Sequence, residues 1–146
     1  MFMAALGFAG SLLSASATLA QGKEIKRQKE MEAAQLEQER QQRKIQTMEA
    51  HNDILDQLDE AEEVNEAQFA FMNRDDDRSL NAFKKSQKSL ASSDVKRVDF
   101  QGLAQMEQLR LRRLGALRAG DAALRASEVT ALSQVVGGAA DFYRSM

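Results

Sequence analysis

Apolar side chains along this chain recur at helical spacing, and no segment alternates apolar and polar residues over strand length. Ile45, Met48 and Leu55 lie three and seven positions apart, which is typical of a coiled-coil seam. The sequence contains no proline, and no glycine occurs between Gly22 and Gly102. Both strong helix breakers are therefore missing from a long stretch. We expect an all-α protein of long, extended helices with coiled-coil-like packing.

The predicted helix ends divide the chain into five segments. The stretch NRDDDRS, residues 73–79, predicts a turn, because Asn and Asp compete for local backbone hydrogen bonds. Ser92-Ser93-Asp94, Gly120-Asp121 and Gly137-Gly138 predict further helix ends. The expected segments are an apolar, small-residue segment 1–22, a long charged helix 23–73, a turn and short helix 74–94, buried amphipathic helices 95–136, and an apolar C-terminal tail 137–146.

Two of these segments carry more apolar surface than one thin chain can cover. The helix from Val95 to Leu117 has apolar residues over more than half of its circumference, so we expect it to be the most buried helix. Apolar faces of this kind predict a homo-oligomer, arranged as a ring or a bundle. The expected oligomer contacts are Ile45, Met48, Leu55, Leu103 and Leu114.

Charge is segregated along the sequence although the net charge is only −2. Residues 45–78 carry eleven acidic and two basic side chains, and residues 79–120 carry nine basic and three acidic ones. Opposite blocks that are adjacent in sequence suit an antiparallel helical hairpin or pairing between subunits, and solvated helix faces are the alternative. Four arginines between leucines would contact either an acidic helix, which we favour, or phosphates of nucleic acid: Arg110, Arg112, Arg113 and Arg118.

No catalytic constellation is present in the sequence. His51 is the only histidine and there is no cysteine, which excludes two-histidine zinc sites and thiolate sites within one chain. Phosphate-binding glycine motifs are missing. The aspartates at 75–77 lack the alternating ligands and the glutamate of a calcium loop, so the turn is the better interpretation. We expect no enzyme activity, no metal site and no cofactor.

The first twenty-two residues carry no charged side chain, and Lys23 is the first charge. A secretory signal would have a basic region before its apolar part, although SATLAQ offers a small-residue cleavage pattern. The stretch is about long enough to span a bilayer as a helix. Small residues recur every four positions, which permits close helix packing in lipid or inside a protein complex. The expected packing face contains Gly7, Ser11, Ser14, Ala15 and Thr18.

The small-residue start MFMAALGFAGSLLSASATLAQG, the proline-free Gln/Glu/Lys/Arg/Ala body and the apolar end LSQVVGGAADFYRS together resemble the small internal virion proteins of short-tailed bacteriophages. These are also called internal core or DNA-ejection proteins. The resemblance covers the whole chain and consists of layout and composition. The chain is shorter than expected for this group and lacks a longer polar tail after the apolar end.

The resemblance implies a structural protein stored inside the capsid near the portal. It would leave the particle with or ahead of the genome and refold into part of a channel across the host cell envelope. The implied partners are further copies of the chain, other internal virion proteins, the portal, the host envelope membrane after ejection, and genomic DNA without sequence specificity. Low contact order and the lack of disulfides suit a protein that must unpack and reassemble.

Two other classes of protein fit the same layout. One is a membrane-anchored lysis protein of the spanin type, with residues 1–20 as anchor and a periplasmic coiled coil behind it. The other is a secreted periplasmic coiled-coil chaperone, whose mature chain would start near Gln21. The location of the protein and its mature N-terminus separate these alternatives.

Overall fold

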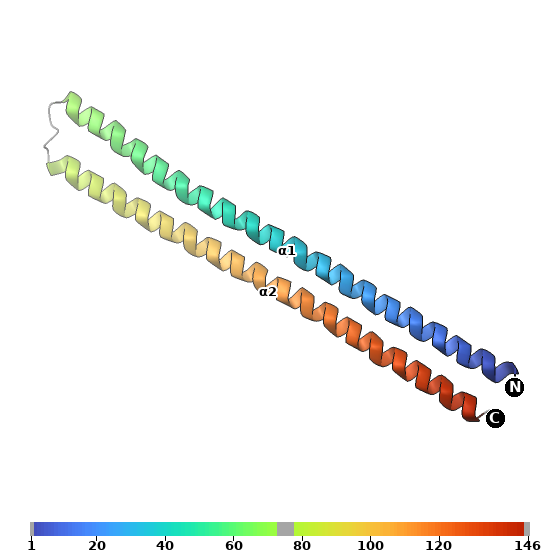
Figure 1. Cartoon of the computed structure of the whole chain (residues 1–146). Helices are drawn as coiled ribbons and strands as arrows, with labels where there is room; N and C mark the ends of the chain where they lie inside the picture. Colours follow the sequence, from blue (N-terminus) through green and yellow to red (C-terminus); the bar gives the residue numbers. More distant parts are fainter. Residues whose placement is uncertain (1, 73–77, 145–146) are drawn as a thin grey trace. The chain divides into compact units, whose positions relative to one another are not determined.

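The computed structural model describes residues 2–72 and 78–144, with side chains from residue 9 onward. Two helices account for this part of the chain: α1, Phe2–Phe71, and α2, Arg78–Arg144 (Figure 1). The described residues contain no strand. The all-α prediction is therefore confirmed, together with the expectation that long helices pack against each other.

Two compact units divide the contacts between these helices. Unit 1 combines Met1–Glu37 with Arg110–Met146, and unit 2 is Gln38–Leu109. Within unit 1, Lys26 lies across from Asp121, and Glu37 lies across from Arg113. Positions that advance along α1 therefore contact positions that go back along α2, which makes the two segments of unit 1 antiparallel.

Unit 2 is also an antiparallel helix pair. His51 lies across from Asp99, and Glu66 lies across from Lys84. The acidic part of α1 and the basic start of α2 thus face each other, which is the hairpin arrangement among those that the charge blocks left open. The last turn of α1 is closed by the amide of Met72, which donates to Gln68 O and Phe69 O, both at 3.2 Å. The predicted turn at 73–79 falls mainly on residues 73–77, which lie outside the described residues.

Three predicted helix ends are wrong. The helix α2 continues through Ser92-Ser93-Asp94, through Gly120-Asp121 and through Gly137-Gly138. The boundary near residue 22 is also wrong, because α1 starts at Phe2 and the apolar stretch continues directly into the charged helix. Glycine is tolerated here because two of these positions lie in the seam between the helices, where a side chain would collide with the neighbouring helix.

The core is a thin seam of mostly small residues. In unit 1 the apolar side chains below 9% exposure are Ala15, Ala33, Ala116 and Ala131, and in unit 2 they are Leu80 and Leu109. No large side chain among the described residues is fully buried. Val95–Leu117 is part of the longer helix α2 and buries one stripe against α1, to which Leu109 and Ala116 belong. Phe100, Leu103 and Leu111 remain 73%, 62% and 61% exposed.

Candidate functional site

The seam of unit 1 is the first of three features that can carry a function, and it depends on close backbone approach. A Cβ added to Gly22 would lie 2.5 Å from Ser127 Cβ and would also overlap Ser127 Oγ. A Cβ added to Gly120 would lie 3.0 Å from Lys29 Cβ and 3.5 Å from the Lys26 backbone. A larger residue at position 22 would collide with Ser127, and one at position 120 would press against Lys29, so the two helices lie close together at these positions.

The predicted packing face of the first segment lies partly in this seam. Ala15 is 5% exposed, and Thr18 Oγ1 donates to Ser14 O at 2.9 Å. The hydroxyls of Ser14 and Thr18 also lie 3.4 and 3.3 Å from Gln134 Oε1 on α2. Ser11 is half-buried. Gly7 belongs to α1, but its packing is outside the part that the structure describes. The structure thus brings Ser14, Ala15 and Thr18 to residues near the C-terminal end of α2.

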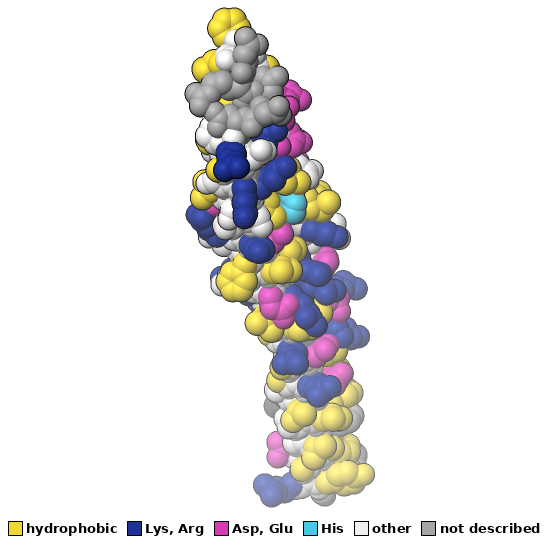
Figure 2. Space-filling model, turned by 90° about the vertical axis from the view of Figure 1, so that its left-hand side faces the viewer, with side chains coloured by type: hydrophobic (Ala, Val, Ile, Leu, Met, Phe, Trp, Pro, Cys, Tyr) yellow, Lys and Arg dark blue, Asp and Glu magenta, His cyan; other side chains and the backbone are white. Residues whose placement is uncertain are grey.

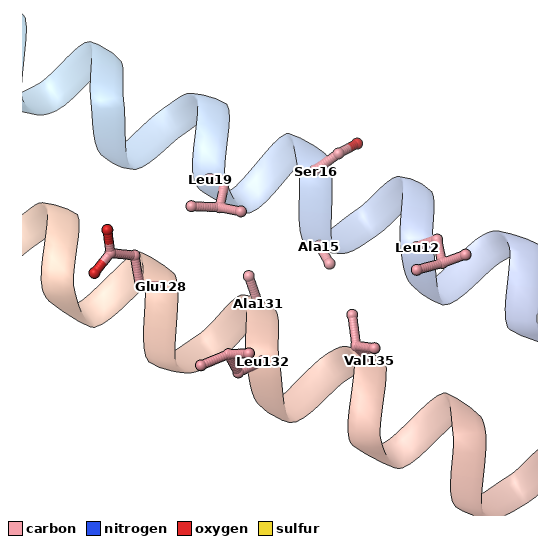
Figure 3. Close-up of a pocket in the computed structure, with 8 residues that line it drawn as sticks. All are labelled: Leu12, Ala15, Ser16, Leu19, Glu128, Ala131, Leu132 and Val135. Atoms are coloured by element: carbon pink, nitrogen blue, oxygen red, sulfur yellow. The ribbon is translucent and has the colours of Figure 1, made fainter.

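An open apolar groove of about 500 Å³ runs along one face of unit 1 and forms the second feature (Figure 3). Ala15 and Ala131 form its floor, and both point into the space between α1 and α2 in Figure 3. Larger side chains and one charged residue stand around this floor. They are Leu12, Ser16 and Leu19 from α1, and Glu128, Leu132 and Val135 from α2.

The sequence contained a partial signal for this groove. The four-residue spacing of small residues placed Ala15 on a packing face, but the sequence did not reveal Ala131 as its partner. The sequence also showed no sign that Leu132, which lies in an apolar run, would be left 65% exposed. Figure 2 shows apolar side chains gathered over the part of the molecule formed by the two chain ends, in the lower part of the view. The groove depends on register, which periodicity alone does not define.

The third feature is an uncovered apolar face of unit 2, which contains the predicted oligomer contacts. Ile45, Met48 and Leu55 are 55%, 57% and 41% exposed, and Leu103 is 62% exposed. At 100° per residue, Met48 and Leu103 project to the same side of an antiparallel pair whose seam contains Thr47 and Gly102. The other predicted contact, Leu114, belongs to unit 1 and is 36% exposed.

The opposite side of unit 2 is polar. A smaller open groove of about 200 Å³ lies there between the two helix segments. Glutamine is the most frequent residue of this groove. Its lining consists of Arg43, Gln46, Thr47, Ala50, Val98, Gln101, Gly102 and Gln105. Unit 2 therefore has one apolar and one polar face.

Within unit 1, one arginine of the RLRRLGALR stretch lies against a glutamate that is outside the acidic segment 45–78. Arg113 Nη1 lies 3.6 Å from Glu37 Oε2, which precedes that segment. All four arginines belong to unit 1, whose α1 part ends at Glu37. Arg112 and Arg118 are exposed. The antiparallel register therefore places the acidic segment opposite lysines of the early part of α2 instead.

Ion pairs between the helices have one partly buried and one exposed partner, and they shift the pKa of two groups. The hydrogen bond from Lys84 Nζ to Glu66 Oε1, together with the charge of Lys84, holds the pKa of Glu66 below its ordinary value. In unit 1, Lys26 Nζ lies 3.0 Å from Asp121 Oδ1, and this hydrogen bond and charge raise the pKa of Lys26. Lys88 Nζ lies 3.3 Å from Glu62 Oε1. These pairs fix direction and register more than they stabilise the fold.

The side chains described by the structure include no group of three or more His, Cys, Asp or Glu that could hold a metal ion. The aspartates at 75–77 are outside the described residues. A membrane-crossing helix, long and apolar enough throughout, does not occur within the described part of the chain.

The fold and these surfaces define an all-α protein of two long packed helices. No protein-family model matches the chain. A search of curated proteins and a search of solved structures also found no match.

Proposed function

We propose that this chain is a structural subunit of a helical assembly and has no catalytic role. The observation that carries the proposal is the set of large apolar side chains that the chain's own helices leave exposed on both units. Phe100, Leu103 and Val136 are 73%, 62% and 67% exposed. Large apolar side chains that stay exposed in numbers mark surfaces where proteins or membranes bind.

The exposed area of the chain supports association. The chain exposes 11082 Å², whereas a compact monomer of 16.2 kDa exposes about 7,500 Å². Covering this surface would supply the apolar burial that the thin seams lack.

The particular assembly we propose is the one implied by the resemblance to internal virion proteins of short-tailed bacteriophages. The chain would be stored near the portal, and it would leave with the genome and join other internal virion proteins in a channel across the host envelope. A thin seam of small residues supports this proposal, because two helices that bury little surface unpack at modest cost. The exposed Arg112 and Arg118 suit non-specific contact with genomic DNA.

The apolar stretch 1–22 has two roles in this proposal. In the stored protein its described residues pack against the C-terminal part of α2, through Ala15 and Gly22. After ejection the stretch would leave this seam and enter the host membrane, where its small residues would pack helices together. Removal of the stretch would uncover Ser127 and Ala131, which supports its retention in the working protein.

Mass spectrometry of purified particles tests this function. We expect the chain in intact particles, its loss after genome release, and its recovery in the envelope fraction of infected cells. The major capsid protein, which stays with emptied particles, is the control. A stable inner-membrane location during lysis with no copies in particles would favour a spanin-type lysis protein. A periplasmic chain that starts near Gln21 would favour a secreted chaperone.

A further inference from the structure

We infer that the groove of unit 1 binds the apolar ridge of a second copy of this chain, so that two hairpins join face to face. The inference deepens the proposed function, on which it rests, by naming the surface through which copies associate. The groove is open along its length, and its floor consists of Ala15 and Ala131 (Figure 3). Alanine on the floor leaves space that the chain itself does not fill.

The ridge that would fill this space lies beside the groove on the same helix. Val129, Leu132 and Val136 are three and four positions apart on α2 and are 67%, 65% and 67% exposed. Leu132 also lines the groove, so ridge and groove belong to one continuous surface. Large side chains of one helix pack between residues of another at this spacing.

A surface that contains both a groove and a matching ridge is suited to pairing with itself. In a two-fold interface each copy presents the same patch, and the ridge of one copy enters the groove of the other. A partner that covers this whole surface must supply a ridge for the groove and a groove for the ridge, and a second copy carries both. The observed combination therefore favours a second copy as the occupant.

Charge around the groove is also compatible with self-pairing. Glu128 lines the groove, and Arg125 lies seven positions before Leu132, hence on the same side of α2. Each copy thus brings one charge of each sign to the rim, and a two-fold axis can pair them between copies. The net charge of −2 produces little repulsion between two chains.

Sedimentation equilibrium of the full chain tests the inference. We compare the wild type with a groove variant, Leu12→Gln with Leu132→Gln, and with Thr130→Gln as control on the opposite side of α2. We expect the wild type to reach at least twice the monomer mass at micromolar concentration. The groove variant should associate at least tenfold more weakly, and the control should match the wild type. Both variants should keep the helical circular dichroism signal, because the substituted side chains are exposed.

Cysteine crosslinking gives a second measurement that does not depend on the strength of association. The chain has no cysteine, so a single introduced thiol reports only contacts between copies. A mixture of Leu19→Cys and Val136→Cys chains should form a mixed disulfide dimer under mild oxidation. A mixture of Leu19→Cys and Thr130→Cys chains should not form it. Equal crosslinking in both mixtures would overturn the inference.

The outcomes separate the inference from the proposed function. A monomer at all concentrations overturns both. Association that is insensitive to the groove variant but weakened by Leu103→Gln overturns the inference alone, because it places the interface on unit 2. Binding of the monomer to phosphatidylcholine–phosphatidylglycerol vesicles, lost in the groove variant, would identify lipid as the occupant and would also overturn the inference.

Discussion

Single small residues decide how closely the two helices approach in unit 1. Gly22 faces Ser127, and a Cβ at position 22 would lie 2.5 Å from Ser127 Cβ. Glycine inside a helix costs roughly 0.5–1 kcal/mol relative to alanine, so its presence requires a packing reason. Contact between the helices supplies this reason at Gly22, whereas Gly115 is exposed and has nothing within 4 Å of an added Cβ.

Gly22→Ala and Gly115→Ala should therefore change stability in opposite directions. Gly22→Ala forces the helices apart and should lower the free energy of unfolding by about 1–3 kcal/mol. Gly115→Ala should raise it by about 0.5–1 kcal/mol, because only the helix propensity changes. Urea denaturation followed by circular dichroism measures both values.

A compensating substitution serves as the control for this prediction. Ser127→Gly removes the atoms that collide with the new Cβ, so the Gly22→Ala, Ser127→Gly double variant should lose less stability than the two single variants predict together. Purely additive losses would show that positions 22 and 127 are not in contact.

The ion pair between Lys84 and Glu66 makes a residue-scale contribution that depends on pH. Because the folded pKa of Glu66 is lowered, its stabilising effect is present above the ordinary value of 4.5 and is lost as the pH falls through the folded pKa. Wild type should therefore be more stable than Glu66→Gln at pH 7, and the difference should decrease below about pH 4.5. Urea denaturation between pH 3 and 7 measures the difference.

Glu63→Gln is the matched control, since it removes one negative charge from an exposed position on the same helix. If Glu66→Gln and Glu63→Gln gave the same pH profile, the effect would come from the overall charge of α1 and not from the pair with Lys84.

At the scale of the element, α2 is one helix where the sequence suggested several. Ser92-Ser93-Asp94 was expected to start a new helix because these residue types cap helices. In the structure Ser93 is exposed within the helix, and its hydroxyl donates to Ser89 O at 3.0 Å. The Ser93 hydroxyl thus finds its hydrogen-bond acceptor within the helix, so this serine does not need to cap a helix end.

Proline at position 93 distinguishes a continuous helix from a turn. Ser93→Pro would remove a backbone hydrogen bond and clash with the carbonyl of Ser89, at a cost of about 3 kcal/mol in a helix interior. We expect a lower urea midpoint and a smaller helical signal at 222 nm. Ser93→Ala, the control, should change stability by less than about 0.5 kcal/mol. A Ser93→Pro variant as stable as Ser93→Ala would show that α2 ends near this residue.

At the scale of the whole molecule, stability should depend on protein concentration. The seams bury mostly small residues, and large apolar side chains such as Met48, Phe100 and Leu132 remain exposed. If association covers them, the folded state is stabilised by mass action and the thermal midpoint rises with concentration. Circular dichroism melts at about 2 and 200 μM should differ by several degrees. Identical midpoints would mean that the chain folds to its full stability as a monomer.

The sequence predicted the helical class and a surplus of apolar surface. It also predicted an unbroken helix between residues 23 and 71, because this stretch contains no proline or glycine. Local propensity and the absence of proline determine these properties, and neither depends on the partner of a helix. The sequence also predicted that the first long helix ends near residue 73. In the structure α1 ends at Phe71, and α2 starts at Arg78.

Register and the identity of the seam were decided only by the tertiary structure. A glycine that ends a helix and a glycine that admits a neighbouring helix look alike in sequence, so Gly120 was assigned to a helix end although it lies against Lys26 and Lys29. In the same way, periodicity showed an apolar stripe along α2. It did not show that Ala131 would be buried against α1 while Leu132, the next residue, would stay exposed. Contacts between residues more than a hundred positions apart, such as Ser14 with Gln134, depend on how the two helices align. Local sequence determined the helices, and the steric fit of small side chains between them determined which faces are buried and which stay open to a partner.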